Sequence, residues 1–255
     1  MRYDEDAPVQ PHLGQSPTLS IVTVTFDNDE GLARTLSSLR FLRGIPFEVV
    51  VIDGASLQST AELIAETGVE EITLIQEPDG GPYFAMNKGL DAASGAWIWF
   101  LNAGDEVAPQ ISPGRLVELF NEHKSSVLLG IALRPDATTA WQYNLGEVLR
   151  GYSAPCHQAT IIDRALCNSR SFDTRYKVSA DYDFLLSVAE EAPVAPIDMP
   201  LCLYEAGGMS ERLRGRLELE TLLIRLRHGI QPLRALPADI LRVPWRALRN
   251  WRRRR

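Results

Sequence analysis

The chain has 255 residues, of which 45% are hydrophobic and 23% charged, and its formal net charge is −7. This composition excludes a disordered chain and a collagen-like polymer, and the length is ample for one large α/β domain with a buried core. The cysteines, Cys156, Cys167 and Cys202, are widely spaced and form no CxxC pair. They predict neither a disulfide framework nor a zinc knuckle, and they favour a reducing cytosol.

The charge is divided unevenly along the chain. Residues 211–255 contain 13 arginines and four acids, a balance of +9, whereas residues 1–210 carry a balance of −16. A basic segment on an acidic body is typical of a protein that meets an anionic surface. Because the basic stretch is short and terminal, we expect a membrane surface and no nucleic acid. The longest apolar run, residues 96–101, is far shorter than the roughly 18 residues that span a bilayer.

The hydrophobic pattern predicts strands alternating with helices. Residues 1–18 are polar and aperiodic, and we expect a flexible leader there. The expected strands are residues 19–26, 47–53, 71–77 and 96–102, and the expected helices between them are residues 30–42, 59–68 and 82–95. This alternation predicts an α/β fold with a mostly parallel central sheet covered by helices. Within the last strand, Trp97, Trp99 and Phe100 are expected in the core.

Acidic or amide side chains follow all four expected strands. They are Asp27, Asp53, Asp79, and the pair Asn102 and Asp105. Any one of them could simply favour a turn, but four in succession place negative charge along one edge of the sheet. Ligands bind beyond the carboxyl ends of parallel strands, so this edge is the predicted site.

The turn after the first strand narrows the kind of ligand. Its sequence, TVTFDNDEG, contains neither GxGxxG nor a phosphate-binding GxxxxGK[ST] loop. Phosphate charge must then be balanced differently. A divalent metal, Mn²⁺ or Mg²⁺, held by Asp105 is the candidate, with Asn102 or the ligand's own phosphates completing the coordination.

Six segments in order carry a resemblance to a known family. They are LSIVTVTFDNDEGLARTLSSL, FEVVVIDGAS, EPDGGPYFAMNKGL, WIWFLNAGDE, CHQATII and YKVSADYDFLL. Together they resemble the inverting glycosyltransferases of family 2, over roughly residues 19–210. The nearest-looking branch is that of colanic-acid, exopolysaccharide and phenolic-glycolipid enzymes. The resemblance implies a GT-A fold, which is Rossmann-like, and a nucleotide diphosphate-sugar donor of UDP or GDP type.

The resemblance also implies roles for individual residues. Residues that would surround the nucleotide base and ribose are Thr25, Phe26, Asp27 and Asp53. Residues that would line the rest of the donor cleft are Asp79, Asn87 and Lys88. The NAGD segment corresponds to the metal-binding DxD element, with Asp105 as its remaining acid and Asn102 in place of the usual first aspartate. Phe84 stands where close relatives carry an aspartate.

An inverting transfer needs one base to take the proton of the acceptor hydroxyl. Asp181, at the start of an apolar helix, occupies the family's position for this base, and Asp183 is the reserve candidate. The alternative is that either residue only favours the helix N-terminus. His157 is expected to bind the acceptor or a diphosphate oxygen, or to act only as a structural hydrogen-bonding group.

Residues 211–255 are expected to form a basic extension. Leu213, Leu217 and Leu223 or Leu226 recur on one side of an amphipathic helix. Farther on, Trp245 and Trp251 recur among arginines, which is typical of a segment lying in a membrane interface, although a solvated terminus is the alternative. We therefore expect a cytoplasmic protein, peripheral on the inner face of the plasma membrane.

The sequence thus predicts a glycosyltransferase that moves a sugar from a nucleotide diphosphate donor to a saccharide or a lipid-linked acceptor. One alternative is a sugar nucleotidyltransferase, which would be expected to carry a glycine-rich basic loop after the first strand. Another is a non-catalytic membrane-associated scaffold of the same fold, for which Asn102 and Phe84 give some support.

Overall fold

The computed structural model describes residues 18–55, 58–69, 71–134, 140–141, 145–149, 156–205 and 207–230. The leader apart from residue 18, and the arginine-rich segment that contains Trp245 and Trp251, lie outside the described residues. Among the described residues, no helix is both long and apolar enough to cross a bilayer.

The first half of the chain alternates strand and helix as predicted. Its elements are β1 (Leu19–Thr25), α1 (Asp29–Ser38), β2 (Phe47–Asp53), α2 (Gln58–Glu66), β3 (Ile72–Gln76), α3 (Pro82–Ala92) and β4 (Trp97–Phe100). Asn28 begins α1, because its side-chain oxygen accepts a hydrogen bond from the backbone N–H of Gly31. The last turn of the predicted first helix is a separate 3₁₀ helix, Leu39–Leu42.

The second half is less regular. It contains β5 (Glu106–Val107), α4 (Pro113–Glu122), β6 (Val127–Leu133), β7 (Ala140–Trp141), α5 (Leu145–Leu149), β8 (Thr160–Asp163), α6 (Ala180–Ala189), β9 (Val194–Leu203), α7 (Met209–Arg212) and α8 (Arg214–Arg227). Short 3₁₀ helices, His157–Ala159 and Arg164–Cys167, flank β8.

All nine described strands join one sheet, in the order β3-β2-β1-β4-β8-β6-β9-β5, with β7 paired to β6. The pairs among β3, β2, β1 and β4 are all parallel. Strand β8 runs antiparallel to both of its neighbours, β4 and β6. The sheet is therefore parallel over its first four strands and mixed beyond them, since the alternation of strand and helix that favours parallel pairing stops after β4.

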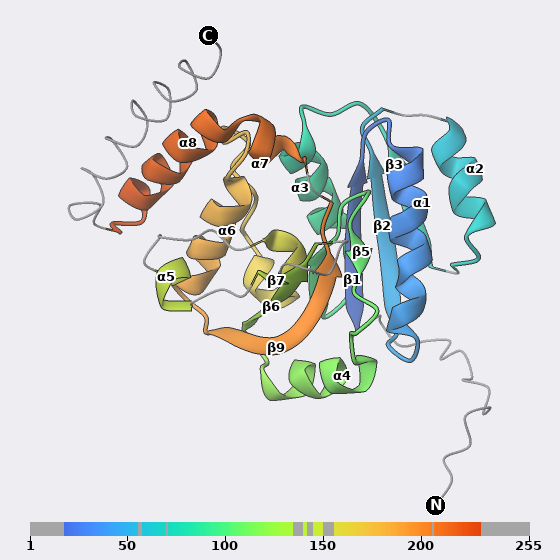
Figure 1. Cartoon of the computed structure of the whole chain (residues 1–255), viewed down its shortest axis with the longest axis horizontal. Helices are drawn as coiled ribbons and strands as arrows, with labels where there is room; N and C mark the ends of the chain where they lie inside the picture. Colours follow the sequence, from blue (N-terminus) through green and yellow to red (C-terminus); the bar gives the residue numbers. More distant parts are fainter. Residues whose placement is uncertain are drawn as a thin grey trace, which may run out of the picture.

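Two hydrophobic clusters cover the two faces of the sheet. Successive residues of β1 point to opposite faces, so Ile21 packs in the cluster with Leu36 of α1, and Val22 packs in the cluster with Met86 of α3. Figure 1 shows α1 and α3 on opposite sides of β1 and β2. Trp97, Trp99 and Phe100 are all buried, as the sequence predicted. Burial of each such apolar side chain contributes about 1.5–3 kcal/mol to the stability of the fold. This packing fixes the positions of the strand ends, which polar residues follow.

Helix α8 lies against α6 in the C-terminal part of the fold (Figure 1). Its buried residues are Ile224, which packs against Tyr182 and Leu186, and Glu220, which accepts hydrogen bonds from the backbone N–H groups of Lys177 and Val178. The helix itself was predicted, but Leu213, Leu223 and Leu226 of the predicted apolar side are exposed.

Candidate active site

The end of β1 carries three of the predicted nucleotide-binding residues. Thr25 is buried, and its hydroxyl has no hydrogen-bond partner among the described residues. Phe26 is 71% exposed, and Asp27 has a positive φ of 49°. An exposed aromatic ring at the end of a strand can stack on a flat ligand such as a nucleotide base.

Both carboxylate oxygens of Asp53, at the end of β2, accept hydrogen bonds from neighbouring groups. Its Oδ1 accepts from the backbone N–H of Ala55 at 2.9 Å, and its Oδ2 accepts from Thr60 Oγ1 at 3.0 Å and Gln76 Nε2 at 3.2 Å. Asp79 lies next to this turn, since a Cβ placed on Gly54 would stand 2.6 Å from Asp79 Oδ2. The glycine therefore lets the two acidic strand ends approach each other.

Helix α3 positions Asn87 and Lys88. The Asn87 amide donates to the backbone oxygen of Phe172 at 3.0 Å and accepts from its N–H at 2.8 Å, so this side chain joins α3 to the segment before α6. Lys88 forms a salt bridge with Glu77 at 2.9 Å and keeps part of its surface exposed. The structure thus shows that Asn87 fixes the segment around Phe172 against α3. The roles of Asn87 and Lys88 in donor binding stay predictions.

Asp105, the predicted metal ligand, is only 4% exposed. Its Oδ1 accepts from the backbone N–H of Glu205 and its Oδ2 from Gln158 Nε2, both at 2.9 Å. Burial raises the pKa of Asp105 above its ordinary value, although these two hydrogen bonds act in the opposite direction. The described residues contain no group of three histidine, cysteine or acidic side chains that could hold a metal ion.

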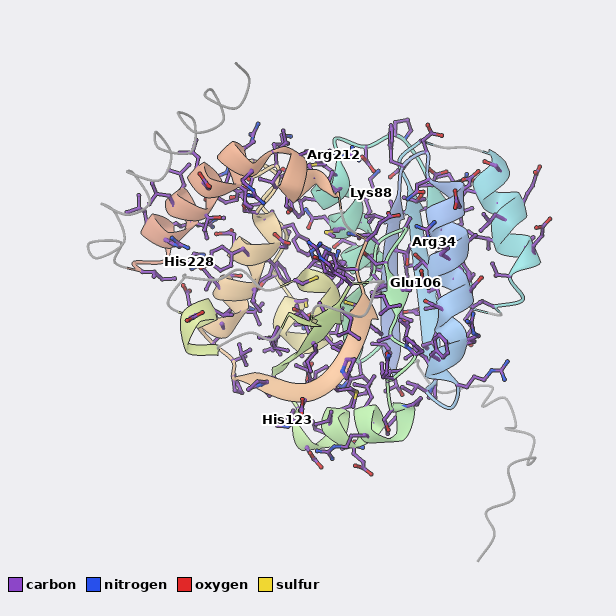
Figure 2. The ribbon with its side chains drawn as sticks, in the orientation of Figure 1. Arg34, Lys88, Glu106, His123, Arg212 and His228 are labelled. Atoms are coloured by element: carbon purple, nitrogen blue, oxygen red, sulfur yellow. The ribbon has the colours of Figure 1, made fainter. Side chains whose placement is uncertain are left out.

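The neighbouring glycine brings another carboxylate close. Gly104 has a φ of +104°, and a Cβ there would stand 2.2 Å from Glu205 Oε2. Glu205 is held in turn by Arg34, whose Nη2 lies 2.6 Å from its Oε1. Arg34 also lies 3.7 Å from Glu106, and Figure 2 shows these two side chains beside α1. The end of β9 is thereby fixed against the loop that follows β4.

A continuous chain of hydrogen bonds crosses the centre of the site. Asn102 Nδ2 lies 3.0 Å from His157 Nε2, and His157 Nδ1 lies 2.8 Å from Asp181 Oδ2. Asp181 Oδ1 accepts from the Tyr83 hydroxyl at 3.1 Å and from the backbone N–H of Tyr182 at 2.9 Å. Side chains from α3, the loop after β4, the turn before β8 and the start of α6 meet here, so four separate segments determine the orientation of one carboxylate.

The protonation of this chain follows from burial and charge. Burial by itself lowers the pKa of His157, but the hydrogen bond and charge of Asp181 outweigh it, and the pKa is raised above its ordinary value. Burial, together with the charge of Asp181, raises the pKa of Tyr83 well above its ordinary value, so the phenol keeps its proton and donates a hydrogen bond to Asp181.

Asp183, the reserve candidate for the base, lies away from this chain. It is buried between α6 and α8, where Arg227 Nη1 approaches its Oδ2 at 2.8 Å and His228 Nε2 approaches its Oδ1 at 2.9 Å. Figure 2 shows His228 at the end of α8. Through these contacts, Asp183 attaches the end of α8 to α6.

Three residues of the site were not singled out from the sequence: Tyr83, Gln158 and Glu205. Tyr83 lies one turn before Asn87 on α3, and Gln158 directly follows His157. Trp99 Nε1 donates to the backbone oxygen of Gln158 at 2.7 Å, so the core of the sheet also positions the residue that holds Asp105.

This mixed α/β sheet, with acidic residues following its parallel strands, has the GT-A fold. The chain belongs to glycosyl transferase family 2, whose family model matches residues 20–176. The resemblance seen in the sequence, the GT-A fold and the enzyme class are thereby confirmed.

Several named proteins and solved structures are similar to this chain. A PGL/p-HBAD biosynthesis glycosyltransferase of Mycobacterium tuberculosis is 29% identical, with 94% of this chain and 99% of the relative covered. The succinoglycan biosynthesis protein ExoO of Rhizobium meliloti is 31% identical over 39% of this chain and 29% of its own. Residues 1–349 of TarS from S. aureus superimpose with a TM-score of 0.63 at 19% identity, covering 82% of this chain and 65% of that chain. This chain therefore spans slightly less than two thirds of the solved TarS fragment.

A mannosyltransferase from Pyrobaculum calidifontis, solved with GDP-Man and Mn²⁺, superimposes with a TM-score of 0.62 at 19% identity, covering 88% of this chain and 68% of that one. TarS has been solved with UDP and with UDP-GlcNAc. These structures confirm the fold, and they include complexes with UDP, UDP-GlcNAc and GDP-Man.

Proposed function

We propose that this glycosyltransferase moves a sugar with inversion from a nucleotide diphosphate donor, of UDP or GDP type, to a saccharide or lipid-linked acceptor. The observation that carries the proposal is the carboxylate of Asp181, held by three hydrogen-bond donors at the edge of the sheet where the strand-end acids meet. The names of the mycobacterial relatives and of ExoO, which refer to PGL/p-HBAD and succinoglycan biosynthesis, are consistent with such an acceptor.

The nucleotide would lie at the ends of β1 and β2. Phe26 offers an exposed ring to the base, and Thr25 ends the strand directly before it. Asp27 and Asp53 are the acids that would face the ribose, as in the predicted assignment. Asp79 and Lys88 would line the donor cleft beside them, with Asn87 holding its wall.

The reaction needs one displacement at the anomeric carbon. The acceptor hydroxyl attacks from the side opposite the diphosphate, which leaves with the electron pair of the broken bond. Asp181 accepts the proton of the acceptor hydroxyl. Its two oxygens are held in place by hydrogen bonds with Tyr83, Tyr182 and His157. Such fixed donors reduce the reorganisation that the reaction requires.

We also propose that a divalent cation accompanies the donor. The residues present fit a cation that takes one protein carboxylate, Asp105, and obtains its other ligands from the diphosphate and water, which is how Mg²⁺ is commonly held at nucleotide sites. The raised pKa of buried Asp105 favours this assignment, because a nearby cation would stabilise its charged form. When bound, the cation would offset charge developing on the leaving diphosphate.

Asp105→Asn tests that assignment. The amide keeps the size of the side chain but removes its charge, so we expect Mn²⁺ to lose its effect on nucleotide affinity while the fold is kept. Isothermal calorimetry with UDP and GDP, with and without Mn²⁺, gives the measurement, and Asp91→Asn on the exposed side of α3 is the matched control. Unchanged manganese dependence in Asp105→Asn would place the cation elsewhere.

For location, we propose the cytoplasmic face of the plasma membrane. On α8, Leu219, Leu223 and Leu226 are 56%, 47% and 52% exposed, beside Arg216 and Arg227. Leucines flanked by arginines are typical of a surface that lies on an anionic bilayer. The tail beyond residue 241 adds seven arginines and two tryptophans.

Membrane binding can be measured by co-sedimentation with vesicles that contain anionic lipid. Each arginine near such a surface contributes about 1 kcal/mol, so three or four are sufficient to hold the protein there. We expect binding that weakens at high salt, a blue shift of tryptophan fluorescence, and release when the chain is truncated after Pro244. Replacement of Leu219, Leu223 and Leu226 by glutamine should weaken binding further, and vesicles of neutral lipid are the control. If anionic vesicles change neither sedimentation nor fluorescence, the membrane assignment is wrong.

A thermal-shift screen tests the donor assignment. Ligands that bind only the folded state raise the unfolding temperature. We expect UDP or GDP, but not both equally, to stabilise the protein more strongly with Mn²⁺ than without it. No shift with any nucleoside diphosphate up to millimolar concentration would contradict the proposed donor class.

A further inference from the structure

Two cysteine side chains from distant parts of the chain meet beside the candidate site. Cys156 comes directly before the 3₁₀ helix His157–Ala159, and Cys202 lies in β9, which packs against that helix. Both side chains lie in the hydrophobic cluster that includes α1, and a hydrogen bond joins the two thiols. Two thiols in direct contact can form a disulfide without a large movement of the backbone.

The two thiols begin a chain of hydrogen bonds that ends at Asp105. Cys156 donates its S–H to Gln158 Oε1 at 2.7 Å, so the hydrogen between the two sulfurs comes from Cys202. Gln158 Nε2 in turn donates to Asp105 Oδ2 at 2.9 Å. The orientation of the Gln158 amide therefore depends on the Cys156 thiol at one end and on the Asp105 carboxylate at the other.

The two donors of Asp105 come from the same two segments as the thiols. Gln158 is two residues after Cys156. Glu205, whose backbone N–H donates to Asp105 Oδ1 at 2.9 Å, is three residues after Cys202. A covalent bond between the two sulfurs would join the segments that together hold this carboxylate.

We propose that Cys156 and Cys202 are a modification site, at which a peroxide forms a reversible disulfide that loosens the hold of Gln158 on Asp105. Cys156 is partly exposed and meets the oxidant, whereas Cys202 is completely buried and acts as the resolving thiol. The site itself is independent of the proposed transfer reaction. Its effect on donor binding rests on the proposed function of Asp105.

The oxidation has two steps. The Cys156 sulfur attacks one oxygen of hydrogen peroxide, the O–O bond breaks, and a sulfenic acid and one water form. The Cys202 sulfur then attacks the sulfenic sulfur, the S–S bond forms, and the hydroxyl leaves as a second water with the proton of the Cys202 thiol. The two sulfurs thereby lose two electrons to the peroxide, and a dithiol reductant can return them.

The disulfide removes the hydrogen that Cys156 donates to Gln158. The backbone of Gln158 stays fixed by Trp99, whose indole N–H donates to its carbonyl oxygen, but the side-chain amide loses one of its two partners. Asp105 is then held less firmly. Loss of one hydrogen bond of this kind changes an equilibrium by roughly 2- to 10-fold. We expect the oxidised protein to bind a nucleoside diphosphate with Mn²⁺ more weakly by that factor.

Thiol counting and peptide mapping by mass spectrometry test the site. The full chain is treated with hydrogen peroxide, and its remaining thiols are alkylated. We expect the count to fall from three thiols to one, with Cys156 linked to Cys202, and dithiothreitol to restore all three. Burial raises the pKa of Cys167 to about 12, so this cysteine stays a thiol, and Cys167→Ala is the matched control that should still form the disulfide. Absence of the linked peptide would overturn the proposal.

Replacement of the resolving thiol tests the order of the two steps. Cys202→Ala and Cys202→Val remove this thiol and fill its buried position with apolar side chains of different size. After peroxide treatment, the sulfenic acid should remain on Cys156 in both variants, where dimedone traps it. Dimedone labelling of Cys167 instead, or of no cysteine, would contradict the assignment of Cys156 as the residue that meets the oxidant.

Calorimetry tests the effect on donor binding. UDP and GDP with Mn²⁺ are titrated into the reduced protein, the oxidised protein, and the oxidised protein after dithiothreitol. We expect the loss of affinity to be reversed by the reductant, and untreated Cys202→Ala to bind as the reduced wild type does. A mapped disulfide with unchanged affinity would overturn the coupling to Asp105. A reduced wild type that binds no nucleoside diphosphate would contradict the proposed function instead, and the mapped disulfide would still confirm the site.

Discussion

Asp181→Asn is expected to keep donor binding and to lose turnover by a factor on the order of 10² to 10⁴. The amide matches the carboxylate in size, so Tyr83, Tyr182 and His157 retain a neighbour of the same shape. It cannot accept the proton of the acceptor hydroxyl, so the transfer step should slow while the donor still binds. The measurement is kcat for nucleoside diphosphate release, with donor affinity determined separately by calorimetry.

Asp183→Asn is the matched comparison for that variant. Asp183 lies two residues along the same helix and pairs with Arg227 and His228 of the α8 end, so its loss should weaken the attachment of α8 and lower the unfolding temperature. Its kcat should fall much less than that of Asp181→Asn. The opposite ranking in a transfer assay would move the proton-accepting role to Asp183.

Trp99→Ala should lower the free energy of unfolding by about 3–5 kcal/mol, the usual cost of removing a fully buried large aromatic side chain. Trp99 is completely buried in β4, and its indole N–H donates to the backbone oxygen of Gln158. The substitution therefore opens a cavity and also leaves a buried acceptor unpaired. Urea unfolding followed by circular dichroism gives the measurement.

Trp99→Phe separates the two contributions of this side chain. It keeps most of the apolar surface and removes only the indole donor, so the loss should be smaller, about 1–3 kcal/mol. Because Gln158 holds Asp105, we also expect the manganese dependence of nucleotide binding to weaken in this variant. A stability equal to that of the wild type in Trp99→Phe would show that the hydrogen bond to Gln158 does not form in solution.

The first half of the fold could be predicted from the sequence because its local signals agree with one another. Leu32 and Leu36 recur at helical spacing, β-branched residues fill β1 and β2, and polar residues follow each strand. The antiparallel strand β8 and the curved strand β9, which lies between β6 and β5, depend on pairing between residues far apart in the chain. No local period of the sequence records such pairing.

The strand-end acids illustrate what position alone can and cannot predict. Asp53 and Asp105 were expected to face a ligand, and both lie at the predicted edge, but the structure shows their oxygens engaged by internal donors. Whether a carboxylate is open or engaged depends on neighbours such as Thr60, Gln158 and Glu205. These neighbours come from other segments, so their contacts appear only once the chain is folded.

The link between His157 and Asp181 likewise has no sequence signal. The two residues are 24 positions apart, and each had a separate role in the sequence-based account, one as a binding residue and one as the base. Their side chains meet because the 3₁₀ helix His157–Ala159, just before β8, and the start of α6 reach the same edge of the sheet. The predicted residues were therefore sufficient to locate the site, whereas the contact between His157 and Asp181 is seen only in the structure.

The central claim is that this site performs glycosyl transfer from a nucleotide diphosphate sugar. It is tested most directly by measuring nucleoside diphosphate release from a panel of UDP- and GDP-sugars, with wild type and Asp181→Asn side by side. The account predicts that at least one donor is turned over by the wild type, and that the variant binds this donor with equal affinity and releases its diphosphate at least 100-fold more slowly. Equal rates for the two proteins, or no release from any donor by the wild type, would contradict it.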